Sequence, residues 1–176
     1  MKLIILLNDH ELLKINILER KNNKMRKSKH SGLDVAWYVV DYARSNNNEI
    51  TNLKLQKILY YIQATSIKKN NAVFFNRPIE AWRHGPVIRE VYNYYRAYMH
   101  KPITDTYAPI NDFTENEKKL MQDVIKKFIK LDEWDLVDKT HNEDPWKLAS
   151  SNGKYLNDEI TIKSMKAYFQ DKDIGE

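Results

Sequence analysis

Apolar side chains recur at every third or fourth position along most of this chain, the spacing that places them on one face of an α-helix. One such stripe follows Thr51 and Asn52, either of which can cap the start of a helix. Another follows Thr114, which has the sequence pattern of a capping box with Glu117. The pattern predicts helices over Leu33–Ala43, from Thr51 or Asn52, from Pro86 to about Tyr98, from Thr114 to about Leu131, from Asp132 to His141, from Asp144 and Pro145, and around Ile162–Phe169.

A small β-hairpin is the one non-helical element that the pattern indicates. Two short runs rich in β-prone residues, 72–75 and 79–82, flank residues 76–78, which suit a tight turn. Gly85 and Pro86 follow, and because Pro has no amide hydrogen it is tolerated in the first turn of a helix. A chain of 176 residues suits one ordinary domain. We therefore predict a mainly α fold, a single compact domain of about six or seven helices with one small β-hairpin.

Some polar and aromatic side chains do not fit the apolar stripes. In the helix after Thr51, the residues off the stripe are Gln56, Tyr60 and Gln63. One interpretation is contact with a partner; the favoured one places tyrosine at the margin of the core with its hydroxyl in water. The tyrosines after Pro86 cannot all be buried on one stripe, so part of their surface is available for binding. They are Tyr92, Tyr94, Tyr95 and Tyr98.

The net charge of +5 is confined to the first 30 residues. Residues 1–30 contain eight Lys or Arg against three Asp or Glu, whereas the remaining residues contain twenty-one of each. We divide the chain into a basic N-terminal arm, 1–30, and a domain, 31–172. A nucleic-acid interpretation rests on the arm alone, where six positive charges lie between Arg20 and Lys29, and the favoured interpretation of that run is a solvated charged segment. Met25 is an alternative start, in which case the residues before it are an added extension.

The sequence lacks the residue patterns of common catalytic and metal sites. There is no cysteine, which excludes disulfides and thiolate metal ligands. There is no phosphate-binding glycine loop or nucleophile elbow, and the spacing of His84 and His141 does not place two metal ligands on one helical face. The apolar run Leu3–Leu7 is too short for a membrane span. We expect a cytoplasmic protein that is not an enzyme, with no catalytic residue, cofactor or metal.

Four blocks of sequence contain combinations of residues that a helix or a turn alone would not require. The most unusual is Ile79–Val87, which reads IEAWRHGPV; the others are Leu53–Ala64, Thr140–Trp146 and Ile160–Phe169. In their order these blocks resemble the Panacea domain of SocA-like antitoxins, over roughly residues 33–169. Such domains occur in bacterial toxin–antitoxin pairs and in small phage- and mobile-element-associated proteins. The resemblance implies a scaffold that binds a cognate protein toxin encoded nearby, and it leaves open direct occlusion of the toxin and its delivery to a protease.

Two of these blocks pair an aromatic side chain with charges at a helix entry, so we expect them to pack together. In the favoured interpretation Trp82 and Trp146 fill the core, while polar neighbours, among them Glu80, hydrogen-bond around the loop. The alternative is direct contact with the partner. The candidate partner-binding residues are Arg83, His84, Tyr92, Tyr95, His141 and Glu143, and the candidate structural residues are Gln56, Trp82, Gly85, Pro86, Asp144 and Trp146.

These observations predict an antitoxin that neutralises a cognate toxin by direct protein binding. The alternative is a DNA-binding or autoregulatory accessory protein of a phage or mobile element, which would use the basic arm. An enzyme is a third class, disfavoured because the catalytic patterns are missing. The identity of the toxin and the oligomeric state do not follow from the sequence.

Overall fold

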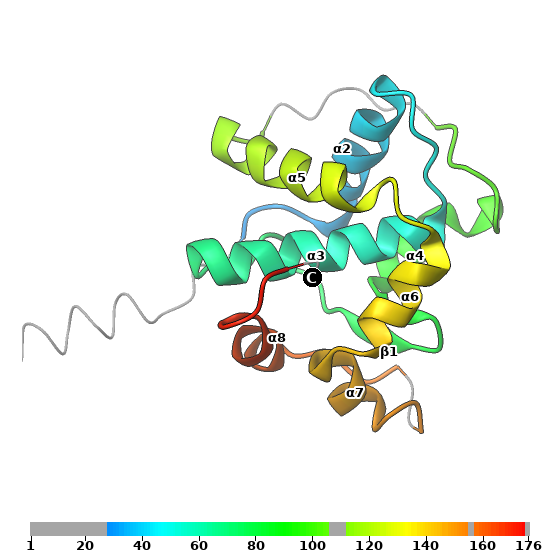
Figure 1. Ribbon diagram of the computed structural model, residues 1–176. Coiled ribbons are helices and arrows are strands. Elements are labelled where there is room, and N and C mark those ends of the chain that lie inside the picture. Colours follow the sequence, from blue (N-terminus) through cyan, green and yellow to red (C-terminus); the bar gives the residue numbers. More distant parts are fainter. Residues whose placement is uncertain (1–27, 106–111, 155–156, 175–176) are drawn as a thin grey trace, which may run out of the picture.

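The computed structural model describes residues 28–105, 112–154 and 157–174, so nearly all of the basic arm lies outside the described residues. Within these ranges the chain folds as one mainly helical domain with seven α-helices and one small antiparallel sheet (Figure 1). The predicted fold class is therefore confirmed. The elements are α2 (Gly32–Ser45), α3 (Asn52–Asn70), β1 (Glu80–Trp82), β2 (Gly85–Val87), α4 (Arg89–Tyr95), the 3₁₀ helix η1 (Arg96–Tyr98), α5 (Glu115–Phe128), α6 (Glu133–His141), α7 (Asp144–Ser150) and α8 (Ile162–Phe169).

Local capping explains where most of the helices begin. Ser31 and Thr114 form capping boxes at the starts of α2 and α5, and the side chains of Thr51, Asp132 and Thr161 accept backbone hydrogen bonds at the starts of α3, α6 and α8. Each such cap stabilises a helix by about 1 kcal/mol. The predicted helix starts near Thr51, Thr114 and Asp132 are confirmed, because a cap depends only on residues within three positions of each other.

Helix α3 forms the centre of the fold. Figure 1 shows it crossing the molecule between α2 and α5 on one side and α7 and α8 on the other, and it also contacts α4, α6 and β2. Because α3 is surrounded, Gln56, Tyr60 and Gln63 are at most 1% exposed. The prediction that the tyrosine lies at the margin of the core is therefore wrong, and neither Tyr60 nor Gln63 is accessible to a partner. The Gln63 amide oxygen accepts hydrogen bonds from the backbone of Phe74 (2.8 Å) and Phe75 (3.2 Å). These hydrogen bonds offset the free-energy cost of burying the polar Gln63 side chain.

The hairpin exists, but it lies further along the chain than predicted. β1 and β2 are joined by a turn at Arg83 and His84, so the predicted turn at 76–78 is wrong. Pro86 is a strand residue opposite Ala81, and α4 begins only at Arg89, so the predicted helix start at Pro86 is also wrong.

A hydrogen-bond pattern explains why proline fits in this strand. The backbone of Ala81 bonds to the segment on its other side, donating to the Asp158 carbonyl (2.8 Å) and accepting from the Asn157 amide (2.8 Å). Pro86 opposite therefore needs no amide hydrogen of its own. Pro86 lacks an amide hydrogen, and a residue without this donor is tolerated both at a helix start and at a strand position that makes no ladder hydrogen bond. Only the pairing of segments that are distant in the sequence shows which of the two applies.

Candidate protein-binding site

An apolar groove of about 320 Å³ lies where the start of α3, the hairpin turn, the α4–η1 segment and the start of α6 meet. Three large apolar side chains on its walls are exposed: Tyr92 by 38%, Trp134 by 52% and Met99 by 75%. Contiguous exposed apolar surface with polar neighbours is typical of a binding site. The groove is lined by Thr51, Asn52, Leu53, Gln56, Trp82, Arg83, His84, Val87, Tyr92, Met99, His100, Glu133 and Trp134.

One wall is built on Trp82, which the hairpin holds in a fixed orientation. Its indole Nε1 donates to a carboxylate oxygen of Glu80 (2.8 Å), and the Arg89 guanidinium lies 5.2 Å from the centre of its ring. Arg89 also binds Glu80, at 2.6 Å and 3.0 Å. The ring of Tyr92 packs against Trp82 with 4.9 Å between centroids. Because two partners fix Trp82, this wall is preorganised, which lowers the entropic cost of binding.

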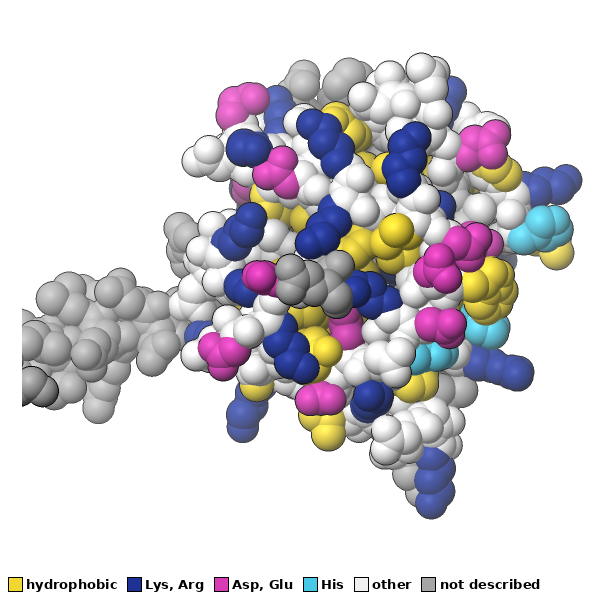
Figure 2. All heavy atoms as spheres, viewed as in Figure 1, with side chains coloured by type: hydrophobic (Ala, Val, Ile, Leu, Met, Phe, Trp, Pro, Cys, Tyr) yellow, Lys and Arg dark blue, Asp and Glu magenta, His cyan; other side chains and the backbone are white. Residues whose placement is uncertain are grey.

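The opposite wall is formed by Trp134, in the first turn of α6. Asp132 caps the helix by accepting from the Trp134 amide (2.8 Å), and the imidazole of His84 meets the indole edge-on at 5.3 Å. Glu133 accepts a hydrogen bond from the Thr51 hydroxyl, which ties the start of α6 to the start of α3. Figure 2 shows hydrophobic side chains beside histidines and acidic side chains over α6.

The floor of the groove carries amide side chains whose hydrogen bonds are directed into the protein. The Gln56 oxygen accepts from the Ile88 amide (2.8 Å), and the Gln56 nitrogen donates to Asn52 Oδ1 (3.0 Å). Asn52 in turn donates to the Tyr92 carbonyl (3.1 Å). Since these groups are already bonded, the floor favours an apolar occupant over one that needs new polar partners.

A buried lysine supports the hairpin from below. Lys57 on α3 is fully buried, and its Nζ donates to the Pro86 carbonyl (3.0 Å). Burial lowers the pKa of the Lys57 ammonium from 10.5 to about 7, because the charged form loses its hydration. Gly85 has a φ of +95°, and a Cβ there would lie 2.7 Å from Thr140 Oγ1 and 2.8 Å from Lys57 Cε. The glycine is thus required both by conformation and by the close approach of α3 and α6.

The block Thr140–Trp146 packs against the hairpin, as predicted. Trp146 donates from its indole nitrogen to the Trp82 carbonyl (3.0 Å), and the ring of His141 stacks on Trp146 at 4.0 Å. Burial, together with the nearby charge of Lys57, lowers the pKa of His141. Trp146 is buried, as expected, but Trp82 stands outside the core in the groove wall, so its expected role as a core plug is wrong.

Glu143 lies inside the protein at the start of α7. Its two carboxylate oxygens accept hydrogen bonds from the hydroxyls of Tyr60 (2.8 Å) and Tyr61 (2.9 Å). Burial raises the pKa of Glu143 from 4.5 to about 7, although the two hydroxyls partly offset this by stabilising the anion. The prediction that the Tyr60 hydroxyl lies in water is wrong, because it bonds to Glu143 instead.

The structure separates the candidate partner-binding residues into three groups. Arg83, His84 and Tyr92 line the groove. Tyr95 and Glu143 are buried, with Tyr95 fully covered, so neither presents a surface for a partner in this structure. His141 forms the third group and is half-buried against Trp146. Among the candidate structural residues, Asp144, at the first position of α7, is exposed.

The sequence did not indicate two of the exposed apolar residues of the groove, Trp134 and Met99. Trp134 follows the Asp132 cap by two positions, and a tryptophan in the polar first turn of a helix is itself a signal of surface function. Met99 ends η1 with a φ of 54°, and its side chain is the most exposed large apolar group among the described residues. No local pattern distinguishes it from a residue of an ordinary connecting segment.

Within the described ranges, no group of three or more His, Asp or Glu side chains is placed to hold a metal ion. None of the helices in the described part of the chain is long and apolar enough to cross a membrane.

Comparison with known proteins identifies the scaffold. Residues 55–147, more than half of the chain, match the family model for the antitoxin SocA-like Panacea domain. The chain belongs to this family. The resemblance drawn from the sequence is thereby confirmed for these residues, while the block Ile160–Phe169 lies outside the match. No curated protein and no solved structure matches the chain.

The matched part of the Panacea domain contains most of the groove. It includes the hairpin with Trp82, the α4–η1 segment with Tyr92, and the start of α6 with Trp134. It also includes the buried Lys57, which holds the hairpin against α3, and the buried Glu143, which holds the start of α7 against α3. The family scaffold and the candidate binding site are therefore largely the same part of the molecule.

Proposed function

We propose that this protein neutralises a cognate protein toxin, encoded beside it, by binding the toxin directly through the groove between the hairpin turn and α6. Membership of an antitoxin family supports a toxin as the partner in general terms. The observation that carries the proposal is the exposure of Tyr92, Met99 and Trp134 around a floor whose polar groups are already bonded.

The chemistry of the groove favours a protein partner that inserts an apolar side chain. Tryptophan and tyrosine dominate the energetics of protein interfaces, because they bury a large area at little entropic cost. Trp134 and Tyr92 face the groove from opposite walls, so an inserted side chain would contact both. Around the opening, the guanidinium of Arg83 and the carboxylate of Glu133 carry opposite charges, and His84 and His100 add polar ring nitrogens, so the toxin surface around the inserted side chain is expected to be polar and of mixed charge.

The test begins with the gene beside this one. Its expression alone should arrest growth, co-expression with this protein should restore growth, and the two proteins should co-purify. If the neighbouring product is harmless and does not bind, the proposed function is wrong.

The site is tested on that complex by calorimetric titration of Trp134→Ala and Tyr92→Ala. Each substitution should raise Kd by about 30-fold, the equivalent of about 2 kcal/mol for an interface hot spot. The matched control is Leu148→Ala on α7, which removes a side chain that is 70% exposed and lies outside the groove. Melting temperatures are measured beside Kd: Trp134→Ala and Leu148→Ala should change them little, whereas Tyr92→Ala should lower the melting temperature somewhat, because Tyr92 packs against Trp82, and should still leave the variant folded at the temperature of the titration. A control that weakens binding as much as the groove variants would refute the groove as the interface.

A further inference from the structure

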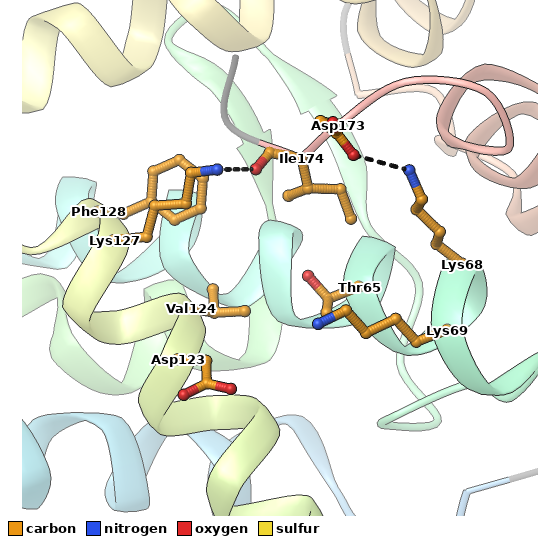
Figure 3. Close-up of a pocket in the computed structure, with 9 residues that line it drawn as sticks. All are labelled: Thr65, Lys68, Lys69, Asp123, Val124, Lys127, Phe128, Asp173 and Ile174. Carbon is orange, nitrogen blue, oxygen red and sulfur yellow. Dashed lines mark hydrogen bonds and ion pairs between the residues drawn. The ribbon is translucent and has the colours of Figure 1, made fainter.

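A second pocket, of about 310 Å³, lies between α3 and α5 and is partly covered by the segment after α8 (Figure 3). Its floor is apolar, with Val124 and Phe128 from α5. Its rim is basic, with Lys68 and Lys69 from α3 and Lys127 from α5. This pocket shares no lining residue with the groove described above.

The covering segment is held through two of its backbone carbonyls, one carboxylate and one apolar side chain. Lys68 donates to the Lys172 carbonyl and pairs with the Asp173 carboxylate (3.4 Å), and Lys127 donates to the Ile174 carbonyl. The Ile174 side chain packs against the core. Figure 3 shows the two lysines reaching the segment from opposite sides while the isoleucine points into the pocket between them. The pocket thus binds two backbone carbonyls, one carboxylate and one aliphatic side chain of the segment at the same time.

These contacts hold the segment only weakly. The carboxylate of Asp173 is 72% exposed, and an ion pair this exposed contributes little because water and salt screen it. The segment also fills only part of the pocket, which keeps its volume of about 310 Å³ with the segment in place. A longer peptide with the same kinds of groups, carboxylates and an aliphatic side chain, therefore has room to bind. It would need to displace only the weakly held covering segment.

The charges of the pocket point to the same kind of occupant. Of its two carboxylates, Asp123 already pairs with Lys119 (3.0 Å), and Asp173 belongs to the covering segment itself. When the segment leaves, three lysines on the rim face one engaged aspartate. An incoming acidic residue would therefore replace the pairing that Asp173 provides.

We propose that this pocket is a docking site for a protein partner, through an extended acidic segment that carries an aliphatic side chain. Residues 171–174 occupy the site in cis and compete with that partner. The proposal does not rest on the toxin-binding groove, because the two sites are separate and are tested with different variants.

The experiment uses the full chain and a probe peptide that copies residues 170–174, with an amidated carboxyl end. A double variant, Asp173→Lys with Ile174→Ser, releases the covering segment by repelling Lys68 and removing the apolar anchor. Binding is followed by chemical shifts in isotope-labelled protein, which also report whether Thr65 and Val124 at the pocket respond. If the segment occupies the pocket for about 90% of the time, its release should lower the apparent Kd of the peptide about tenfold.

Charge reversals in the released variant locate the site. Lys127→Glu should abolish peptide binding, whereas Lys126→Glu, the matched control next to it on α5 and outside the pocket, should leave it within about twofold. A peptide with both aspartates replaced by lysine should not bind. Equal affinity of the parent and the released variant, or equal loss in the two charge reversals, would overturn the proposal. Unchanged melting temperatures establish that each variant is folded.

Discussion

The buried amine of Lys57 leads to a prediction whose size and pH dependence can both be worked out. Its ammonium lies under the hairpin with one hydrogen bond, to Pro86, and its pKa falls to about 7. In the unfolded chain a lysine has a pKa of about 10.4. Between these two values the unfolded state binds more protons than the folded state, so the free energy of unfolding rises with pH. The penalty for burying Lys57 is complete below pH 7 and disappears above pH 10.4.

The difference between these pKa values corresponds to about 5 kcal/mol, at about 1.4 kcal/mol for each pKa unit. The substitution Lys57→Met keeps an unbranched side chain and removes the charge. It also leaves the Pro86 carbonyl without its donor, which costs about 1 to 3 kcal/mol. At pH 6 the variant should therefore be more stable than the parent by about 2 to 4 kcal/mol, and by pH 10 this advantage should vanish or reverse.

The assay is urea unfolding of the parent and Lys57→Met at intervals from pH 6 to pH 10. The difference between the two proteins isolates Lys57, because every other titrating group is common to both. A difference that does not change over this range would refute the lowered pKa. A variant that is less stable at pH 6 would show instead that the hydrogen bond to Pro86 outweighs the cost of the buried charge.

Three further substitutions test the packing around α3. Relative to the parent, Glu143→Gln should gain about 3 kcal/mol of stability between pH 4.5 and pH 8, since the raised pKa of Glu143 lowers the stability of the parent only where the carboxyl is ionised in the unfolded chain, whereas the cost of replacing one acceptor oxygen by an NH2 donor is the same at both pH values; urea unfolding at pH 4.5 and 8 checks this. Gly85→Ala should destabilise by more than about 1 kcal/mol, measured by thermal unfolding, because a positive φ and contacts below 3 Å oppose a Cβ; an unchanged melting temperature would contradict this geometry. Gln63→Leu should cost about 2 kcal/mol, also by urea unfolding, because it leaves the Phe74 and Phe75 amides unpaired, and a neutral result would show that water replaces the glutamine.

The parts of the fold that the sequence predicted are those that depend on near neighbours. The start of α5 is one example: Thr114 and Glu117 bond to each other's backbone, and three positions of sequence contain the whole interaction. The start of α6 at Asp132 is another. The family could also be recognised, because its blocks are short runs with unusual residues, such as Trp82 to Pro86.

The wrong predictions concern residues whose burial or secondary structure depends on segments that are distant in the sequence. The apolar stripe of α3 could not indicate that the helix is covered on all sides, so the burial of Gln56, Lys57 and Tyr60 was missed. The cost of burying each polar group is offset by a hydrogen bond to a partner more than twenty-five positions away: Gln56 to Ile88, Lys57 to Pro86 and Tyr60 to Glu143. The position of the hairpin was missed for the same reason, since Pro86 fits its strand only because Ala81 bonds elsewhere.

The candidate site divides in the same way. The sequence alone indicated Arg83, His84 and Tyr92 as candidate partner-binding residues, because they are unusual around a turn and on a short helix, and the structure places all three in the groove. It could not place Trp134 or Met99 beside them, show that Glu143 is buried, or decide which of the tyrosines after Pro86 is covered. A groove is formed by the packing of separate elements, here α3, the hairpin, the α4–η1 segment and α6. Which side chains line it is decided by burial and by contacts between those elements, and the chain order of the residues does not contain that information.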